Sequence, residues 1–150
     1  MEAEVYPDRR VIEFINEHFV PAQVHIRDQK AVFERFGASW TPTQIILDPQ
    51  GEEQHRTEGF LPAEDFLAQL ELGLGKMEFH ERHFSEAERM FRAVCDGRPD
   101  SGGAPEACYW AGVAAYKETD DPKHLGAAGA LLTQRYPASE WARKASVWLH

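Results

Sequence analysis

The residues with the clearest chemical potential are two cysteines, Cys95 and Cys108. Two cysteines are too few for a disulfide scaffold, and a separation of 13 residues fits neither a C-x-x-C redox motif nor a pair of zinc ligands. Both lie beside apolar residues and are able to face each other across a loop between helices, yet small buried thiols are common in protein cores. We therefore expect structural roles for both, and a thiol-sensing role is the alternative.

Histidines and carboxylates offer a second kind of chemistry near residue 80. Glu78, His80 and His83 fall within two helical turns, and histidines three residues apart share a helix face that can ligate a metal. No third ligand follows at a defined spacing, so we predict a solvated charged face and no metal site. Gly102-Gly103 follows no strand and is not a phosphate-binding loop. The sequence predicts no catalytic residue and no cofactor within the chain.

Net charge and hydropathy exclude several classes of partner. The chain has 150 residues and a net charge of −9, which argues against a nucleic-acid binder and against adsorption to anionic lipid. No apolar run approaches the ~18 residues of a membrane span, and residues 1–20 lack a secretion signal, so we expect a cytoplasmic protein. Residues 1–75 carry 6 basic and 14 acidic side chains, whereas residues 76–150 carry 10 basic and 11 acidic ones, so the two halves differ in net charge.

The first half alternates between helical and extended patterns. Apolar residues at helical spacing predict a helix over residues 8–18, capped by Asp8. Alternation and β-branched residues predict a strand over residues 19–26, and Asp28 is expected to cap a helix that ends at Gly37. The later elements are a strand at 43–47, a turn at 48–51, a strand at 53–58 and a helix from Pro62 to Leu74.

This order of elements, with Thr41-Pro42 before a strand and a D-P-x-G turn after it, resembles the later part of the thioredoxin-like family over residues 1–74. The resemblance implies an α/β thioredoxin-like fold that is incomplete at its N-terminus. It matches Thr41-Pro42 to the threonine and cis-proline that face the redox cysteines, and it makes Trp40, Thr41 and Pro42 candidate substrate-binding residues. The alternatives are a trans proline that merely ends a loop and a core role for Trp40.

The reactive C-x-x-C of that family has no counterpart in the chain. Residues 1–6 resemble the tail of the helix that follows those cysteines, so we expect the cysteines and a central strand to lie upstream of Met1. In the family, that strand lies between the counterparts of residues 19–26 and 43–47. The alternative is a genuinely shortened protein that fills the gap by repacking or with a second chain, as a homo-oligomer.

The second half contains helical patterns without strands. Leu74-Gly75, then Ala87-x-x-x-Phe91, then Pro99 resemble a tetratricopeptide repeat, in which small residues let paired helices approach. A degenerate second unit follows with Ala111-Gly112, and residues 139–150 resemble a closing helix. Ser85-x-x-Glu88 is expected to cap the second helix of the first unit, with the break near His83. We predict domains at 1–74 and 75–150, packed as one compact unit; the alternative is that the helices only extend the core.

Two functions follow from the resemblances. The first is the later part of a thiol-disulfide oxidoreductase whose C-x-x-C lies upstream. The second is a non-redox module that binds proteins or peptides through the Thr41-Pro42 ledge and the helical surface. In both cases the expected partners are protein or peptide clients, some containing disulfides, and neither nucleic acid nor a membrane.

Overall fold

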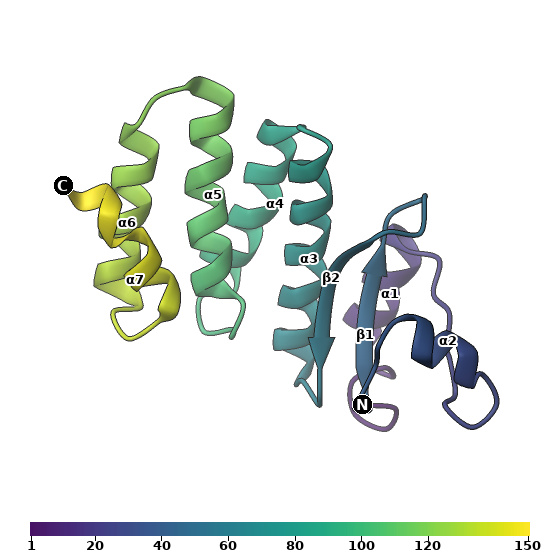
Figure 1. Ribbon diagram of the computed structural model, residues 1–150. Coiled ribbons are helices and arrows are strands. Elements are labelled where there is room, and N and C mark those ends of the chain that lie inside the picture. Colours follow the sequence, from purple (N-terminus) through teal and green to yellow (C-terminus); the bar gives the residue numbers. More distant parts are fainter.

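The computed structural model describes all 150 residues and contains one small sheet and seven α-helices. The elements are α1 (Arg9–His18), α2 (Lys30–Arg35), β1 (Thr43–Leu47), β2 (Glu53–Glu58), α3 (Ala63–His80), α4 (Phe84–Gly97), α5 (Ala104–Thr119), α6 (Lys123–Arg135), α7 (Glu140–Ala145) and the 3₁₀ helix η1 (Ser146–Leu149). The helices from α3 onward stand in a row, and the sheet lies with α1 and α2 at one end of that row (Figure 1). No helix has the length and apolar character needed to span a bilayer.

The first helix forms as the sequence predicts. Asp8 precedes α1, and its carboxylate accepts a hydrogen bond from the backbone N–H of Arg10 at 2.9 Å. This cap satisfies one of the free N–H groups of the first turn. The buried side chain of Val11 then directs the helix toward the core.

The strand predicted over residues 19–26 is wrong. Residues from Val20 onward in this segment are exposed and have no strand partner, because the structure contains only the two-stranded sheet of β1 and β2. A strand needs a neighbour to satisfy its backbone groups, so a suitable sequence pattern alone does not make one. The next helix, α2, also differs from the prediction, because it begins at Lys30 after Gln29 and no side chain caps it.

The hairpin of β1 and β2 matches the prediction. The strands are antiparallel, with Thr43 opposite Glu58 and a bulge after Ile46. Asp48 closes the turn, because its carbonyl accepts from the N–H of Gly51 at 2.9 Å and its carboxylate accepts from two further backbone N–H groups. Gly51 adopts a φ of 84°, which favours glycine at that position.

Helix α3 connects the sheet to the helical row by packing on two sides. Phe66, Leu67 and Leu70 join a core cluster with residues of α1 and β1. Ala68 and Leu72 join the larger cluster of thirteen buried residues that runs through the helices. The domain boundary predicted after residue 74 therefore falls inside a helix that both parts of the molecule use.

Glycines set the close spacing of the later helices. A Cβ atom on Gly75 would lie 2.6 Å from the ring of Phe91, and a Cβ atom on Gly112 would lie 2.4 Å from the Cβ of Ala128. The small residues therefore let α3 meet α4 and α5 meet α6 at short range, as predicted. The predicted cap at Ser85 is wrong, because α4 begins at Phe84 and Ser85 lies inside its first turn without a capping bond.

Candidate functional site

The predicted substrate-binding residues lie on the connection between α2 and β1. Trp40 has 65% of its surface exposed and is not a core residue. The Thr41–Pro42 peptide bond is cis. The hydroxyl of Thr43 donates to the carbonyl of Trp40 at 2.7 Å, and the carbonyl of Pro42 accepts from the N–H of Gly59 at 2.8 Å. These bonds fix the segment to the hairpin and leave the Trp40 side chain in solvent.

Beside this segment, one edge of β1 has no partner. The bond between Pro42 and Gly59 sets the antiparallel alternation, in which every second residue directs its N–H and C=O toward the partner strand. Gln44 and Ile46 therefore face β2, whereas Thr43, Ile45 and Leu47 direct their backbone groups outward. No strand pairs with β1 on that side, and no hydrogen bond reaches these outward groups. The structure thus has a free strand edge about 17 Å long.

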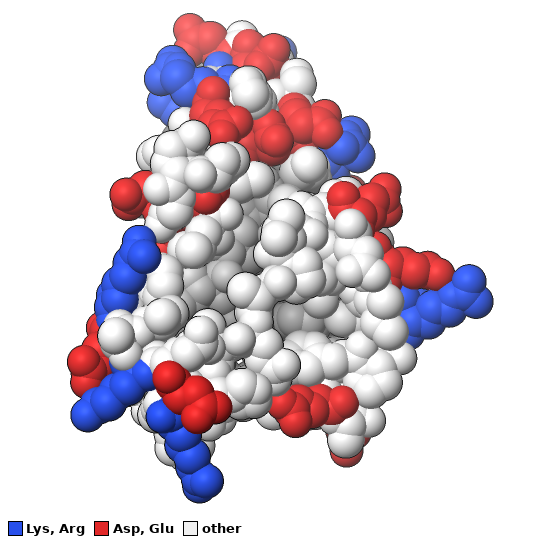
Figure 2. Space-filling model, turned by 90° about the vertical axis from the view of Figure 1, so that its right-hand side faces the viewer, with Lys and Arg blue, Asp and Glu red and all other residues white.

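Apolar side chains are exposed on the same end of the molecule. Val20 is 98% exposed, and Val24 and Ile26 are about half exposed. Their segment runs on the side of β1 away from β2 (Figure 1). Figure 2 shows this face, with uncharged side chains over a hollowed centre and charged ones around the rim. An extended chain laid along β1 would therefore meet both free backbone groups and apolar side chains.

Neighbouring side chains hold the edge in place. The amide of Gln44 donates to the sulfur of Met1 at 3.0 Å, and its oxygen accepts from the hydroxyl of Thr57 at 2.8 Å. On the opposite face of the sheet, the guanidinium of Arg56 donates to the carbonyl of Phe36 and so attaches the end of α2. The free edge therefore belongs to a supported hairpin.

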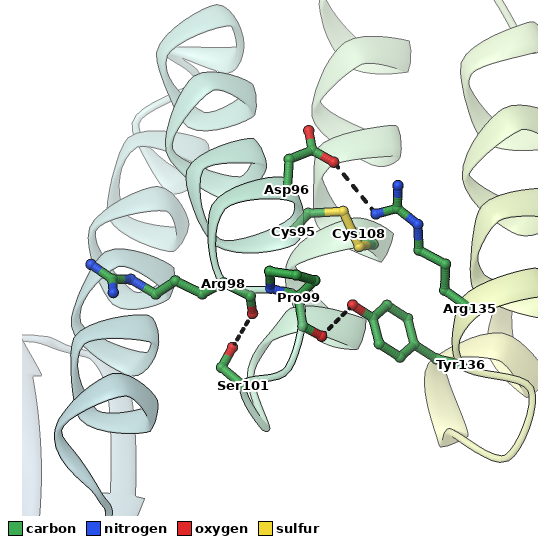
Figure 3. Close-up of a disulfide and its surroundings, with 8 residues drawn as sticks. All are labelled: Cys95, Asp96, Arg98, Pro99, Ser101, Cys108, Arg135 and Tyr136. Carbon is green, nitrogen blue, oxygen red and sulfur yellow. Dashed lines mark hydrogen bonds and ion pairs between the residues drawn. A yellow bond between two sulfur atoms is a disulfide. The ribbon is translucent and has the colours of Figure 1, made fainter.

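The two cysteines, for which the sequence predicts structural roles, form a disulfide with each other. Cys95 of α4 and Cys108 of α5 are 1% and 3% exposed, and the chain has no free cysteine. Figure 3 shows the bond beside the loop that joins these helices. Because the chain has no free cysteine, residues 1–150 present no thiol beside Thr41-Pro42.

The loop closed by the disulfide contacts helices on both of its sides. Arg98 donates to Glu64 of α3 at 2.7 Å, and this hydrogen bond lowers the pKa of the Glu64 carboxyl. The hydroxyl of Tyr136, which follows α6, donates to the carbonyl of Pro99 at 2.6 Å (Figure 3). The disulfide therefore closes a loop that joins neighbouring layers of the helical row.

The candidate metal ligands near residue 80 are only partly brought together. Ligand atoms of Glu78, Glu81 and His83 lie within 4.8 Å of one another, whereas His80, which the sequence suggested, is not in the group. The Nδ1 atom of His83 lies 2.7 Å from Glu78. All three residues lie at the turn between α3 and α4, and the ion pairs among them account for their positions.

A half-buried histidine marks the seam between the sheet and α3, and no sequence motif indicated it. His55 of β2 lies 2.7 Å from the amide oxygen of Gln69, and its Nδ1 accepts from the ammonium of Lys76 at 3.2 Å. Burial and then the charge of Lys76 lower the pKa of the imidazole. Lys76 also pairs with Glu106 at 2.6 Å. This network could be predicted only if the packing of β2 on α3 were known.

An open cleft of about 390 Å³ lies beside this seam. Its lining includes Phe79, Phe91 and Trp110 from three helices, together with Lys76. Glu53, Gln54 and His80 complete the lining.

Comparison with known families agrees with the N-terminal architecture. A family model described as a thioredoxin-like domain matches residues 1–73, and no tetratricopeptide model matches the helical part. The chain matches no curated protein and no solved structure. The resemblance predicted from the order of elements is confirmed: residues 1–73 of this chain are a thioredoxin-like domain.

Proposed function

We propose that this thioredoxin-like protein binds an extended polypeptide segment by adding it as a third strand along the free edge of β1. The observation that carries the proposal is the row of unpaired backbone groups on Thr43, Ile45 and Leu47. Strand addition supplies main-chain hydrogen bonds, each contributing on the order of 1 kcal/mol, and neighbouring side chains add specificity.

Trp40 provides the clearest side-chain contact for such a segment. Its indole is exposed next to the start of β1, where the first residue of an added strand would lie. Aromatic side chains at binding surfaces contribute large contact areas at small entropic cost. We therefore assign Trp40, Thr41 and Pro42 to one end of the bound segment.

Fluorescence anisotropy with a labelled synthetic peptide of about nine alternating valines and threonines tests the proposal. We expect saturable binding and a loss of about tenfold in affinity for Trp40→Ala. Ile45→Pro removes an outward N–H without touching the β1–β2 bonds, and it should weaken binding by a similar factor.

Glu58→Pro is the matched control, because it removes an outward N–H from the opposite edge, on β2. Binding should be unchanged in this variant. Equal affinities for Ile45→Pro, Glu58→Pro and the unaltered chain, with all three folded by circular dichroism, would contradict strand addition at β1.

A second candidate function is favoured by the family match of residues 1–73. We propose it as thiol-disulfide exchange by a C-x-x-C supplied from outside these 150 residues, facing Thr41-Pro42. One thiolate attacks a substrate disulfide, forms a mixed disulfide and releases one substrate thiolate. The second cysteine then breaks the mixed disulfide, so the dithiol is oxidised and the substrate is reduced by two electrons.

Insulin reduction distinguishes the two functions. Residues 1–150 should give no turnover above background, because both cysteines are buried in one disulfide. A protein extended upstream to a C-x-x-C should gain turnover and should lose peptide binding at β1, since the extra strand would cover the edge. Turnover by the 150-residue chain itself would contradict this assignment.

We propose the helical surface only as a further place for contacts with a client. The glycine contacts between α3 and α4 and between α5 and α6 resemble tetratricopeptide packing, and this likeness supports the proposal. A client chain would have to continue past the sheet to reach these helices, because the free edge lies on the side of β1 away from β2 and α3 (Figure 1).

A further inference from the structure

The charge around the free edge indicates which segments it prefers. Residues 1–75 carry 6 basic and 14 acidic side chains, a net charge of −8. Four of the six basic side chains are already neutralised in ion pairs: Arg9 with Glu13, Arg10 with Asp8 and Glu64, Lys30 with Glu34, and Arg56 with Glu53. The remaining excess of carboxylates gives this end of the molecule a negative field.

Some of that charge lies close to β1. Glu2 and Glu4 are exposed in the turn that begins with Met1, whose sulfur contacts Gln44 of β1. Near α2, Lys30 is paired with Glu34, whereas Arg35 lies over the ring of Phe36 at 5.0 Å and keeps its charge. Arg27 and Arg35 form no ion pair, so two unpaired cations stand against the excess of carboxylates in residues 1–75.

We infer that the segment bound along β1 is cationic, with apolar residues at alternate positions and Lys or Arg at its ends. This inference rests on the proposed strand addition. Apolar residues suit the uncharged centre of the face, whose rim carries both acidic and basic side chains (Figure 2). Basic ends suit the net excess of acidic side chains in residues 1–75. A second copy of the chain is a poor occupant, because it brings another net charge of −9 to a surface that is already negative.

Three labelled peptides with the same valine–threonine core, flanked by lysine, glutamine or glutamate, test the inference in anisotropy titrations. At low salt we expect the lysine peptide to bind about tenfold more tightly than the glutamine peptide, and the glutamate peptide most weakly. The differences should shrink severalfold at about 1 M salt, where the Debye length is about 3 Å.

The outcomes separate this inference from the proposed function. Equal affinities for the three peptides would overturn the charge preference and leave strand addition standing. Absence of binding by all three to the folded chain would overturn both. A concentration-dependent dimer in sedimentation, with binding only to the monomer, would assign the edge to a second copy and overturn the inference.

Two double variants of the protein test whether the acidic side chains beside β1 cause the preference for the lysine peptide. Glu2→Gln with Glu4→Gln should reduce the preference for the lysine peptide by about threefold. Asp100→Asn with Glu118→Gln removes the same charge from exposed positions in the helical part, and the preference should then stay nearly unchanged. An equal effect of both pairs would overturn the placement beside β1.

Discussion

The two ends of the molecule differ in how well they bury their apolar side chains. The helical row contains a cluster of thirteen buried residues and a disulfide. The N-terminal end has a cluster of six, and half of these come from α3: Phe66, Leu67 and Leu70. Seven of the nine exposed large hydrophobic residues precede α3, and they include Val20 and Trp40.

Stability and binding are therefore assigned to different parts of the chain. The helical row buries its own core. The sheet end depends on α3 for half of its buried cluster, and it leaves one strand edge and several apolar side chains exposed. Regions with few buried contacts open at lower free energy than the core, and binding surfaces are drawn from them. Changes in the helical row should therefore affect unfolding, and changes near β1 should mainly affect peptide binding.

The largest expected effect comes from Phe91, which is fully buried between α3 and α4. Phe91→Ala should reduce the free energy of unfolding by about 3–5 kcal/mol, because it leaves a cavity in the main core. Phe14→Ala makes the same chemical change in the half-buried surface of α1 and should cost only about 1 kcal/mol. Urea unfolding followed by far-UV circular dichroism measures both. Equal losses would remove the contrast between the two ends.

Removal of the disulfide is expected to have the next largest effect. Cys95→Ala with Cys108→Ala should destabilise the chain by about 2–4 kcal/mol, because the bond restricts the unfolded state and closes the loop that Arg98 and Tyr136 dock. Urea midpoints provide the measurement. A thiol reductant should lower the midpoint of the unaltered chain and leave the variant unchanged. Identical midpoints for both proteins would show that the bond does not form.

Local chemistry explains which parts of the fold were predictable. Asp8 caps α1 and Asp48 closes the hairpin turn through neighbours a few residues away, so the sequence carried the signal. The strand predicted over residues 19–26 failed because strands need partners distant in the chain, and no neighbouring strand is present. Ser85 failed as a cap because it is already the second residue of α4, whereas a capping side chain comes from the residue before the helix, here His83.

Only the sequence motif of the candidate site could be predicted. Thr41-Pro42 and Trp40 were recognisable from the resemblance, but the free edge depends on strand register. The disulfide depends on the approach of α4 and α5, which spacing alone left open. The disulfide also bears on the expected cytoplasmic location, because such bonds persist mainly in oxidising compartments. The location therefore stays a prediction.

Glycine substitutions in α3 and α5 test how closely each end of the molecule is packed. Gly112→Ala should cost about 1–3 kcal/mol, because the new methyl would lie 2.4 Å from the Cβ of Ala128, which moves only with its backbone. Gly73→Ala meets mainly the terminal methyl of Ile46, which can rotate away, and its methyl would lie 3.2 Å from the Cβ of His55, so its cost should be smaller. Gly97→Ala has open space and serves as the control. Melting temperatures rank the three variants. A larger loss of stability for Gly73→Ala than for Gly112→Ala would contradict the looser packing of the sheet end.

The smallest expected effect is a pH dependence at the seam where the two ends meet. Burial and the charge of Lys76 lower the pKa of His55 in the folded chain, whereas the unfolded imidazole titrates near about 6.5. Between these two pKa values the unfolded chain binds more protons than the folded chain. The contribution of His55 to stability is therefore complete above the unfolded pKa and is lost as the pH falls toward the folded pKa.

We expect the urea midpoint of the unaltered chain to fall between about pH 7.5 and about pH 5.5. His55→Gln keeps an amide donor for Gln69 but has no proton to bind, so its midpoint should fall less over the same range. The other six histidines are common to both proteins, and the difference between the two pH profiles isolates His55. Parallel profiles would mean that the imidazole titrates alike in both states. The seam would then be open to water, and the sheet end would be attached to α3 more loosely than the contacts of His55 with Gln69 and Lys76 indicate.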